Sequence, residues 1–482
     1  MNSLLYARAQ MGLSLAFHMI FAAAGVALPL IMVIADALWH RTGDRDYLEF
    51  SKRMAKGTAI LFAVGAVSGT VLSFELGLLW PSFMGTFGEV IGLPFSLEGF
   101  AFFTEAIFLG IYLYGRGKLS PRLHLLSGAL VALSGALSAF FVILVNACMN
   151  HPAGFTMVDG RPADIDPVAA MFSPPWKHET LHGILACYQA TAFVMTGIHA
   201  LVLLRHPSSP LFRKAFAVTL VVAGVTALAQ PLVGHYAAVE VGTGQPAKLA
   251  AMEAHFETSA RAPLLVGGLP DVERGEVDYA IEIPAGLSVF LHADPDAVVP
   301  GLDAVPRDEW PPVAATHLSF QVMVGAGSAM ALLAVVGAVL AWRRRGIPDQ
   351  RPFLWAVILA SPLGIVAMEA GWLVTELGRQ PWIVRGAMRT RDAVTPFPHL
   401  AAPFWTFTAL YVFLGVVVVY LLVRQLRAAP LGVTGGGGGA PLGVTGGGGA
   451  PLGGTGGGGA PLGGTGGGGA PRASGGGEAD AH

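Results

Sequence analysis

Nine stretches of mostly apolar residues, each long enough to cross a bilayer as a helix, dominate this chain of 482 residues. A bilayer core about 30 Å thick requires roughly 20 helical residues, and inside it the backbone must satisfy its own hydrogen bonds. The sequence therefore predicts an all-α, polytopic membrane protein with about nine transmembrane helices. The expected spans are Leu13 to Trp39, Thr58 to Trp80, Leu97 to Tyr114, Leu123 to Asn146, Leu181 to Leu204, Ala215 to His235, Leu318 to Trp342, Phe353 to Glu376 and Pro403 to Val423.

The composition agrees with a membrane protein and excludes two other classes. Only 12% of the residues are charged and the formal net charge is -2, whereas a soluble globular protein carries about 25% charged residues. An ordinary soluble enzyme and a nucleic-acid-binding protein are therefore excluded. The two cysteines, Cys148 and Cys187, form no Cys-x-x-Cys motif, which excludes a cysteine metal cluster and covalently attached c-type haem.

The C-terminal part of the chain differs in character from the rest. Residues 429–482 repeat the pattern A-P-L-G-[VG]-T-G-G-G-G, and such glycine-rich chain predicts a disordered tail. The membrane-embedded part is therefore expected at residues 1–428. Its longest connection, residues 237–316, is rich in charge and proline, and a connection of this length is either functional or disordered.

Lysine and arginine set the expected orientation of the helices. They gather in the first, third, fifth and seventh connections, which places these connections on the cytoplasmic side. The N-terminus and the longest connection are then outside, and the C-terminus is cytoplasmic. The eighth connection is also outside but carries four arginines, which indicates that some of them bind an anionic group; a solvated loop is the alternative. These are Arg379, Arg385, Arg389 and Arg391.

Seven titratable residues inside the expected spans are candidates for a functional site, because an ionisable group in the membrane is costly and marks such a site by default. Several lie toward the outer ends of their helices, at a depth that they share with Met323. Histidine and methionine together can bind haem iron, although a buried histidine can also be a hydrogen-bonded core residue and a methionine a packing residue. The seven are His18, Glu75, Glu98, Glu105, His182, Glu369 and Glu376.

Two of these acids form a pair on the third span. Glu98 and Glu105 are two helical turns apart, which places both carboxyl groups on one face about 10 Å apart along the axis. Such a pair suits a proton path or, alternatively, hydrogen bonds to neighbouring helices. In the eighth span Trp372 lies one turn before Glu376 on the same face, where it can serve as an aromatic wedge beside a cofactor or as ordinary packing.

Four segments of the chain resemble subunit I of the cytochrome bd family of quinol oxidases. They are EGFAFFTEAIFLG around Glu98 and Glu105, QPAKLAAMEAHFET in the longest connection, FQVMVGAG around Met323, and MEAGWLVTELGRQPW at the end of the eighth span. The resemblance covers the nine spans nearly end to end and leaves the tail without a counterpart. The short form of the longest connection resembles the cyanide-insensitive branch of the family.

The resemblance implies three haems and their ligands. His182 and Met323 would hold a low-spin haem b. His18 and Glu376 would ligate two high-spin haems, a second haem b and either haem d or a third haem b, with Trp372 set among them. Which of the two residues serves which high-spin haem stays open.

The resemblance also implies a quinol site in the longest connection. Lys248 and Glu253 match the residues implicated in quinol binding. Arg379 would lie beside the haem propionates, where an arginine can make a bidentate contact. Gln321 stands where many members have arginine, so the electrostatics around the low-spin haem should differ.

For proton uptake the resemblance implies Glu98 and Glu105 near the high-spin haems, with Ser138 and Asn146 on the fourth span. The implied activity is that of a quinol:oxygen oxidoreductase of aerobic respiration in the bacterial cytoplasmic membrane. Quinol would be oxidised at the outer face and O2 reduced to water with protons from the cytoplasm, which creates a proton motive force. The implied partners are subunit II, a small single-helix subunit and membrane lipid, and part of the proton path is expected in a partner subunit.

Two other functions stay open at this point. Intramembrane acids and histidines also mark the pathways of ion or proton transporters. A haem b quinone oxidoreductase that does not reduce O2 would share most of the same residues. A transporter would show no haem bands in the visible spectrum, unlike a redox protein. A quinone oxidoreductase that does not reduce O2 would show haem bands but no oxygen consumption.

Overall fold

The computed structural model describes residues 3–427, and within this range it confirms the predicted all-α membrane fold. Nine helical segments of this part of the chain are long and apolar enough to cross a membrane. The predicted tail, residues 429–482, lies outside the described residues. The spans are α1 (Ser3–Thr42), α2 (Arg45–Leu79), α3 (Pro81–Gly115), α4 (Pro121–Asn150), α6 (Trp176–Arg205), α7 (Pro210–Gly244), α10 (Val313–Arg344), α11 (Arg351–Ala360) with α12 (Leu363–Leu377), and α14 (Ala401–Arg427).

The ends of these helices follow the local sequence. Pro121 and Pro210 begin α4 and α7, at a position where the missing N–H is not needed and the fixed φ suits a helix. The Ser120 hydroxyl caps α4 by accepting a hydrogen bond from Leu123 N at 3.4 Å. Between α1 and α2 the chain turns at Gly43 with a φ of 71°, in the left-handed region that favours glycine.

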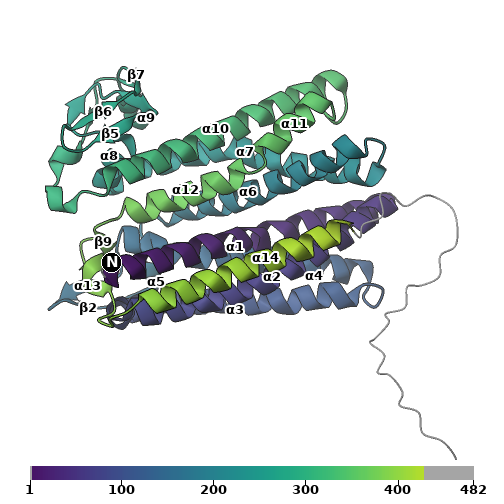
Figure 1. Ribbon diagram of the computed structural model, residues 1–482, viewed down its shortest axis with the longest axis horizontal. Helices are drawn as coiled ribbons and strands as arrows, with labels where there is room; N and C mark the ends of the chain where they lie inside the picture. Colours follow the sequence, from purple (N-terminus) through teal and green to yellow (C-terminus); the bar gives the residue numbers. More distant parts are fainter. Residues whose placement is uncertain (1–2, 428–482) are drawn as a thin grey trace, which may run out of the picture. The chain divides into compact units, whose positions relative to one another are not determined.

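The spans form two groups of helices, which lie one above the other in Figure 1. In the first group α1 contacts α2 and α4, α3 contacts the same two helices, and α14 lies on α1 and α2. In the second group α6, α7, α10 and α12 form a ring in that order, and α11 packs on α6. The largest cluster of buried apolar side chains lies where the two groups meet and includes Ile31, Met32, Phe50 and Phe216.

The eighth span differs from the continuous helix that its sequence predicts. The span is divided into α11 and α12 at Ser361 and Pro362, because proline lacks the N–H that a helix interior requires. Gly197 of α6 accommodates the break, since a Cβ at this position would lie 2.3 Å from the Ser361 Cβ. Both α11 and α12 pack on α6.

The longest connection is folded. Because α7 continues to Gly244 and α10 begins at Val313, the connection is shorter at both ends than the expected 237–316. It contains α8 (Pro246–Glu253), α9 (Gly286–His292) and three antiparallel two-stranded ladders, β3 with β8, β4 with β7, and β5 with β6. The strands are β3 (Ser259–Ala260), β4 (Leu264–Val266), β5 (Leu269–Asp271), β6 (Glu276–Asp278), β7 (Ile281–Ile283) and β8 (Val298–Val299).

The first described residues and the folded connection lie at the same end of the bundle, on the left in Figure 1. The short elements of the fourth and eighth connections lie there too. We call this the outer end and the opposite one the inner end, after the predicted orientation. The short elements are β1 (Thr156–Val158), β2 (Arg161–Ala163), α5 (Pro167–Met171), β9 (Trp382–Val384), β10 (Met388–Arg389) and α13 (Thr390–Ala393).

Candidate functional site

Glu376, near the end of α12, is held from two sides at the outer end. Asn146 of α4 donates from Nδ2 to Glu376 Oε1 at 2.7 Å, and Arg379 donates from Nη2 to Glu376 Oε2 at 2.5 Å. Short contacts of this kind are charge-assisted and fix the carboxylate. Trp372, one turn earlier, is half-buried on the same helix. The structure therefore brings Asn146, which the sequence assigned to the proton path, into contact with Glu376, which it assigned to a haem, and places Arg379, its expected propionate contact, on the other side of the same carboxylate.

Sequence reasoning missed Asn150, which connects this carboxylate to the folded connection. Asn150 is fully buried, and its Nδ2 lies 2.8 Å from Asn146 Oδ1, 2.8 Å from Glu179 Oε1 and 3.1 Å from Thr375 Oγ1. Its Oδ1 accepts a hydrogen bond from Lys248 Nζ at 2.9 Å. We call the whole set the outer network: Asn146, Asn150, Glu179, Lys248, Thr375, Glu376 and Arg379.

Lys248 and Glu253, the two residues proposed for quinol binding, are both buried on α8. Burial lowers the pKa of Lys248 to about 8, although the nearby Glu179 carboxylate raises it. Burial also raises the pKa of Glu253 to about 8, and its Oε2 has no hydrogen-bond partner among residues 3–427. Lys248 passes close to Gly378, where a Cβ would lie 2.7 Å from its Cγ. Both groups can therefore exchange a proton at mildly alkaline pH.

Two side chains of α10 tie the folded connection to the membrane bundle. The ring nitrogens of buried His317 lie 2.8 Å from Met252 O and 3.1 Å from Gly267 O. The Gln321 amide donates to Leu265 O at 3.0 Å and accepts from Gly267 N at 3.0 Å. Gln321 thus makes the pair of hydrogen bonds that a neighbouring strand would make. The Gln321 amide therefore fixes the position of β4.

His182 and Met323 belong to the second ring of helices. The His182 ring lies against Gly234 of α7, and Gln230 Nε2 is 3.4 Å from each of its nitrogens. This distance is too long for a strong hydrogen bond, so the ring remains able to ligate iron. Met323 lies against Gly371 of α12, where a Cβ would lie 2.9 Å from the Met323 sulfur. His182 and Met323 therefore stand on helices at opposite corners of the ring, α6 and α10.

His178, one turn before His182 on α6, is a second residue that sequence reasoning missed. It is buried, and neither ring nitrogen has a hydrogen-bond partner in the described part of the chain. Its ring meets the Tyr236 ring at right angles, with the centroids 6.2 Å apart. A buried polar group without a partner marks a place where a ligand or water binds. The four-residue spacing from His182, which places both rings on one face, is the signal that could have found it.

The surroundings of His18 on α1 suit the tautomer that a metal ligand needs. Its Nδ1 lies 2.9 Å from the Ser68 hydroxyl of α2, which donates to Val64 O at 3.0 Å. When the serine proton is used in this bond, Nδ1 donates to Ser68 and the lone pair remains on Nε2. Gly69 allows this approach, since a Cβ there would lie 3.1 Å from His18 Cε1.

The two acids of α3 face α4 at different depths. Ser138 donates from Oγ to Glu98 Oε1 at 3.1 Å, so these two predicted residues are in contact. Glu105 lies between Gly25 of α1 and Gly135 of α4, where added Cβ atoms would lie 3.9 and 3.4 Å from its carboxyl oxygens. Glu105 is only 4% exposed, and its Oε1 has no partner within residues 3–427.

The buried Arg379 guanidinium has spare hydrogen-bond donors. Its Nη2 binds the carboxylate described above, but Nε and Nη1 have no partner among the residues that the structure describes. Free N–H groups on a buried cation fit the oxygens of an anion such as a haem propionate. Arg385 and Arg389 bind protein groups instead: Arg385 donates to Gly244 O, and Arg389 pairs with Asp308 at 2.8 Å. In the arginine-rich connection, Arg379 therefore best fits the expected anion contact.

Comparison with known proteins places the chain in a family. The sequence profile of the family described as cytochrome bd terminal oxidase subunit I matches residues 6–430. The chain belongs to this family. It is therefore similar along almost its whole membrane-embedded part to subunit I of the cytochrome bd oxidases, as its motifs indicate.

Individual relatives and a solved structure agree with this membership. The chain is 37% identical to the putative cytochrome bd menaquinol oxidase subunit I of Bacillus subtilis, over 89% of this chain and 98% of that protein. It is 30% identical to the cytochrome bd ubiquinol oxidase subunit 1 of the same organism, over 89% and 94%. The bd oxidase structure from Geobacillus thermodenitrificans matches with a TM-score of 0.84 and 39% identity, over 89% of this chain and 99% of that one.

Proposed function

We propose that this chain is the haem-bearing subunit of a terminal quinol oxidase, a quinol:oxygen oxidoreductase of the bacterial cytoplasmic membrane. Membership of the cytochrome bd family supports this activity, and relatives named for menaquinol and ubiquinol support a quinol as the reductant. The observation that carries the proposal is the buried Arg379, which holds Glu376 and keeps two further donors free for an anionic cofactor.

The side chains present fit three haems. His182 and Met323 would hold a low-spin haem b. His18 and Glu376 would hold two high-spin haems, one a haem b and the other haem d or a third haem b, and Arg379 would bind a propionate. When bound, the haems supply electron transfer and the binding and reduction of O2.

Quinol would bind at the outer end, which we propose faces the outside of the cell together with the N-terminus. Lys248 and Glu253 would contact the head group, and the quinol protons would leave to the outside. Through Asn150 the outer network connects Lys248 to Glu376. These hydrogen bonds would fix the position of the quinol-binding helix α8 relative to the residues that hold the haems.

The protons consumed in O2 reduction would come from the cytoplasm, where the C-terminus also lies. Glu98, Glu105, Ser138 and Asn146 would hold and pass these protons toward the outer end. Because the consumed protons cross most of the membrane while quinol protons leave outside, the reaction would create a proton motive force. Subunit II and a small single-helix subunit would complete the enzyme, with membrane lipid around it.

The reduced-minus-oxidised visible spectrum of the purified complex tests this proposal. We expect the bands of low-spin and high-spin haem b, together with quinol-driven oxygen consumption. Removal of the low-spin ligands in H182A and M323A should abolish the low-spin band and keep the high-spin bands. A complex without haem bands would contradict the redox function. A long-wavelength chlorin band would show that one high-spin haem is haem d. If this band were absent, the third haem would be a haem b.

Glu253 makes the stability of the protein depend on pH. Its pKa is raised from about 4.5 to about 8 by burial, so between these values the unfolded chain ionises while the folded protein keeps the proton. Wild-type stability should therefore fall from about pH 4.5 to about pH 8, by up to about 1.4 kcal/mol per pH unit. Glutamine does not ionise. The melting temperature of E253Q should therefore exceed that of the wild type by an amount that grows as the pH rises from 5 to 8.

The melting temperatures of both proteins at pH 5, 6.5, 8 and 9 check this expectation. Lys248 titrates in both proteins and cancels from the comparison. E257Q, which alters an exposed glutamate of the same connection, should follow the wild-type profile. Parallel pH profiles for E253Q and the wild type would show that Glu253 is ionised in the folded protein.

A further inference from the structure

The β4–β7 ladder of the folded connection has one apolar face. Its register pairs Val266 with Ile281 and Leu264 with Ile283. Residues directly opposite each other in a ladder share a face, and side chains alternate between the two faces along each strand. The four apolar residues therefore lie on one face and Glu282 on the other. Three of the four are exposed, and these are Val266, Ile281 and Ile283.

Tyr279 adds an aromatic ring to this surface just before β7. Its side chain is 90% exposed, and its φ of 62° lies in the left-handed region that residues other than glycine seldom adopt. A ring so exposed gains little packing within the chain. We call Val266, Tyr279, Ile281 and Ile283 the apolar ladder face. An exposed group of apolar side chains of this kind marks an interaction surface.

The ladder lies beside a transmembrane helix and not beyond its end. Gln321 of α10 binds the backbone of β4 at Leu265 O and Gly267 N, both at 3.0 Å. Gln321 follows Val313, the first residue of α10, by eight residues, which corresponds to about 12 Å of helix. Figure 1 shows the ladders beside the outer end of α10, on the side away from the first group of helices. The strand β4 is therefore level with the outer turns of a span.

The apolar ladder face continues the exposed apolar surface of α10. Leu318 and Val322 stand on either side of Gln321 in the sequence and are both exposed, on a helix long and apolar enough to cross a membrane. Such side chains face lipid in a bilayer. Because Gln321 binds the edge of β4, β7 is the strand farther from α10. The ladder thus extends the lipid-facing surface of the helix sideways.

The charges of the next ladder, β5–β6, are largely paired with one another. The guanidinium nitrogens of Arg274 lie 2.7 Å from a carboxyl oxygen of Asp271, 3.3 Å from one of Glu276 and 2.6 Å from one of Asp278. The apolar ladder face itself consists of three aliphatic residues and one tyrosine. Its contact with an apolar phase therefore requires no charge to leave water.

We infer that the apolar ladder face rests in the membrane leaflet at the outer end of the bundle. Val266, Ile281 and Ile283 contact acyl chains, and Tyr279 lies at the level of the head groups, where tyrosine is enriched. The partner is lipid because this face continues the lipid-facing surface of α10. Elements that lie in the interface bury their apolar face by about 5 to 10 Å. The folded connection, which contains α8, is thereby held against the lipid layer.

Fluorescence quenching in the intact complex tests this inference. Cysteines introduced as I281C and E282C are labelled with an NBD fluorophore, and the complex is placed in phosphatidylcholine nanodiscs. Phosphatidylcholine with a nitroxide near its head group should quench the label of I281C about twofold more strongly than that of E282C, because the two side chains leave opposite faces of β7. Iodide in the water should quench the two labels in the reverse order.

The wild type, labelled in the same way, gives the background from Cys148, which is buried, and Cys187, which is half-buried. V266C, on the neighbouring strand, should reproduce the result of I281C. Stronger quenching by iodide than by lipid at both positions would overturn the inference, since the face would then lie in water. Quenching by neither agent would also overturn it, because another protein chain would then cover the face. The labels report without enzyme turnover, so the result is independent of the proposed function.

Discussion

Replacement of Arg379 by glutamine (R379Q) should lower quinol-driven oxygen consumption about 100-fold, because Glu376 would lose its charged partner and a small misplacement of a group at a reaction centre costs about that much. Arg379 holds Glu376 at 2.5 Å and is only 2% exposed. Glutamine would keep a polar side chain but would leave the carboxylate with Asn146 as its donor. The free donors Nε and Nη1 that we assign to a haem propionate would be lost as well.

The haem spectrum separates this effect from general unfolding. R379Q should lose high-spin haem and keep the low-spin band, because His182 and Met323 lie on other helices of the second group. R389Q is the matched control in the same connection. Arg389 pairs with Asp308, whose side chain is 67% exposed, and such surface pairs contribute about 0 to 1 kcal/mol. Full high-spin haem content and wild-type oxygen consumption in R379Q would exclude Arg379 from the haem site.

The membrane fold was predictable because the bilayer imposes a length and a polarity on each span. The nine spans of the described residues follow directly from apolar runs. The break at Pro362 was not predicted, because the same apolar residues continue on both sides of it. The folded connection also lacked a signal, since its ladders are two or three residues long and such short strands leave no alternating pattern.

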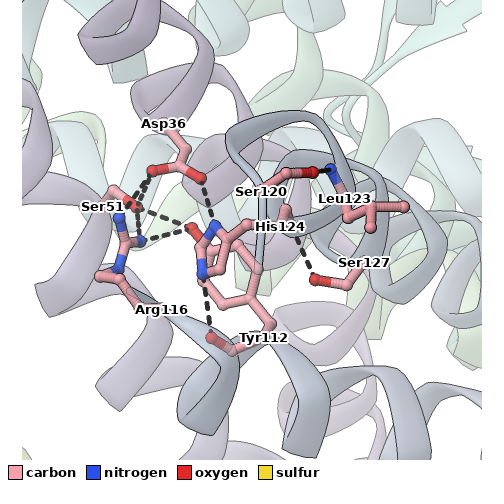
Figure 2. Close-up of polar contacts among 8 residues, drawn as sticks. All are labelled: Asp36, Ser51, Tyr112, Arg116, Ser120, Leu123, His124 and Ser127. Atoms are coloured by element: carbon pink, nitrogen blue, oxygen red, sulfur yellow. Dashed lines mark hydrogen bonds and ion pairs between the residues drawn. The ribbon is translucent and has the colours of Figure 1, made fainter. Parts of the chain in front are cut away.

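Residues of the candidate site were predictable where a charge stood inside an apolar run or where a family motif named them. Asn150 and Glu179 met neither condition, because they lie at helix ends beyond the apolar stretches. Asn150 and Lys248 are in addition 98 residues apart in the sequence, so that only the fold reveals their contact. Asp36 of α1 and His124 of α4, whose side chains lie 3.0 Å apart (Figure 2), stand inside the expected spans but were missed, because each lies within one turn of the end of its span and no motif named it.

The spacing of polar residues along α3 nevertheless predicted part of the candidate site. The two-turn interval between Glu98 and Glu105 predicted a shared face, and the structure confirms that both acids face α4. The same interval continues to Tyr112, which was not considered because a tyrosine in an apolar span is not costly. A search for repeated polar spacing, rather than for charge, would have included Tyr112.

Replacement of Asn150 by alanine (N150A) should lower kcat/KM for quinol about 10- to 100-fold, because hydrogen bonds to charged groups contribute about 1.5 to 3 kcal/mol each. Asn150 accepts from Lys248 and donates toward Glu179. Alanine would leave the buried ammonium group without this partner. Lys248 would then withdraw from the outer network, and α8 would no longer be held against the end of α4.

Comparison of two electron sources locates this effect. When dithionite reduces the complex directly, N150A should react with O2 at the wild-type rate, because Asn146 and Arg379 still hold Glu376. Q189A is the matched control, since Gln189 is a buried amide whose Nε2 lies 3.7 Å from the Met330 sulfur, and it should leave kcat/KM unchanged. If N150A slowed both reactions equally, Asn150 would act on the haem site as a whole. A selective loss with quinol would show that the contact between α4 and α8 transmits the position of the quinol site to the haems.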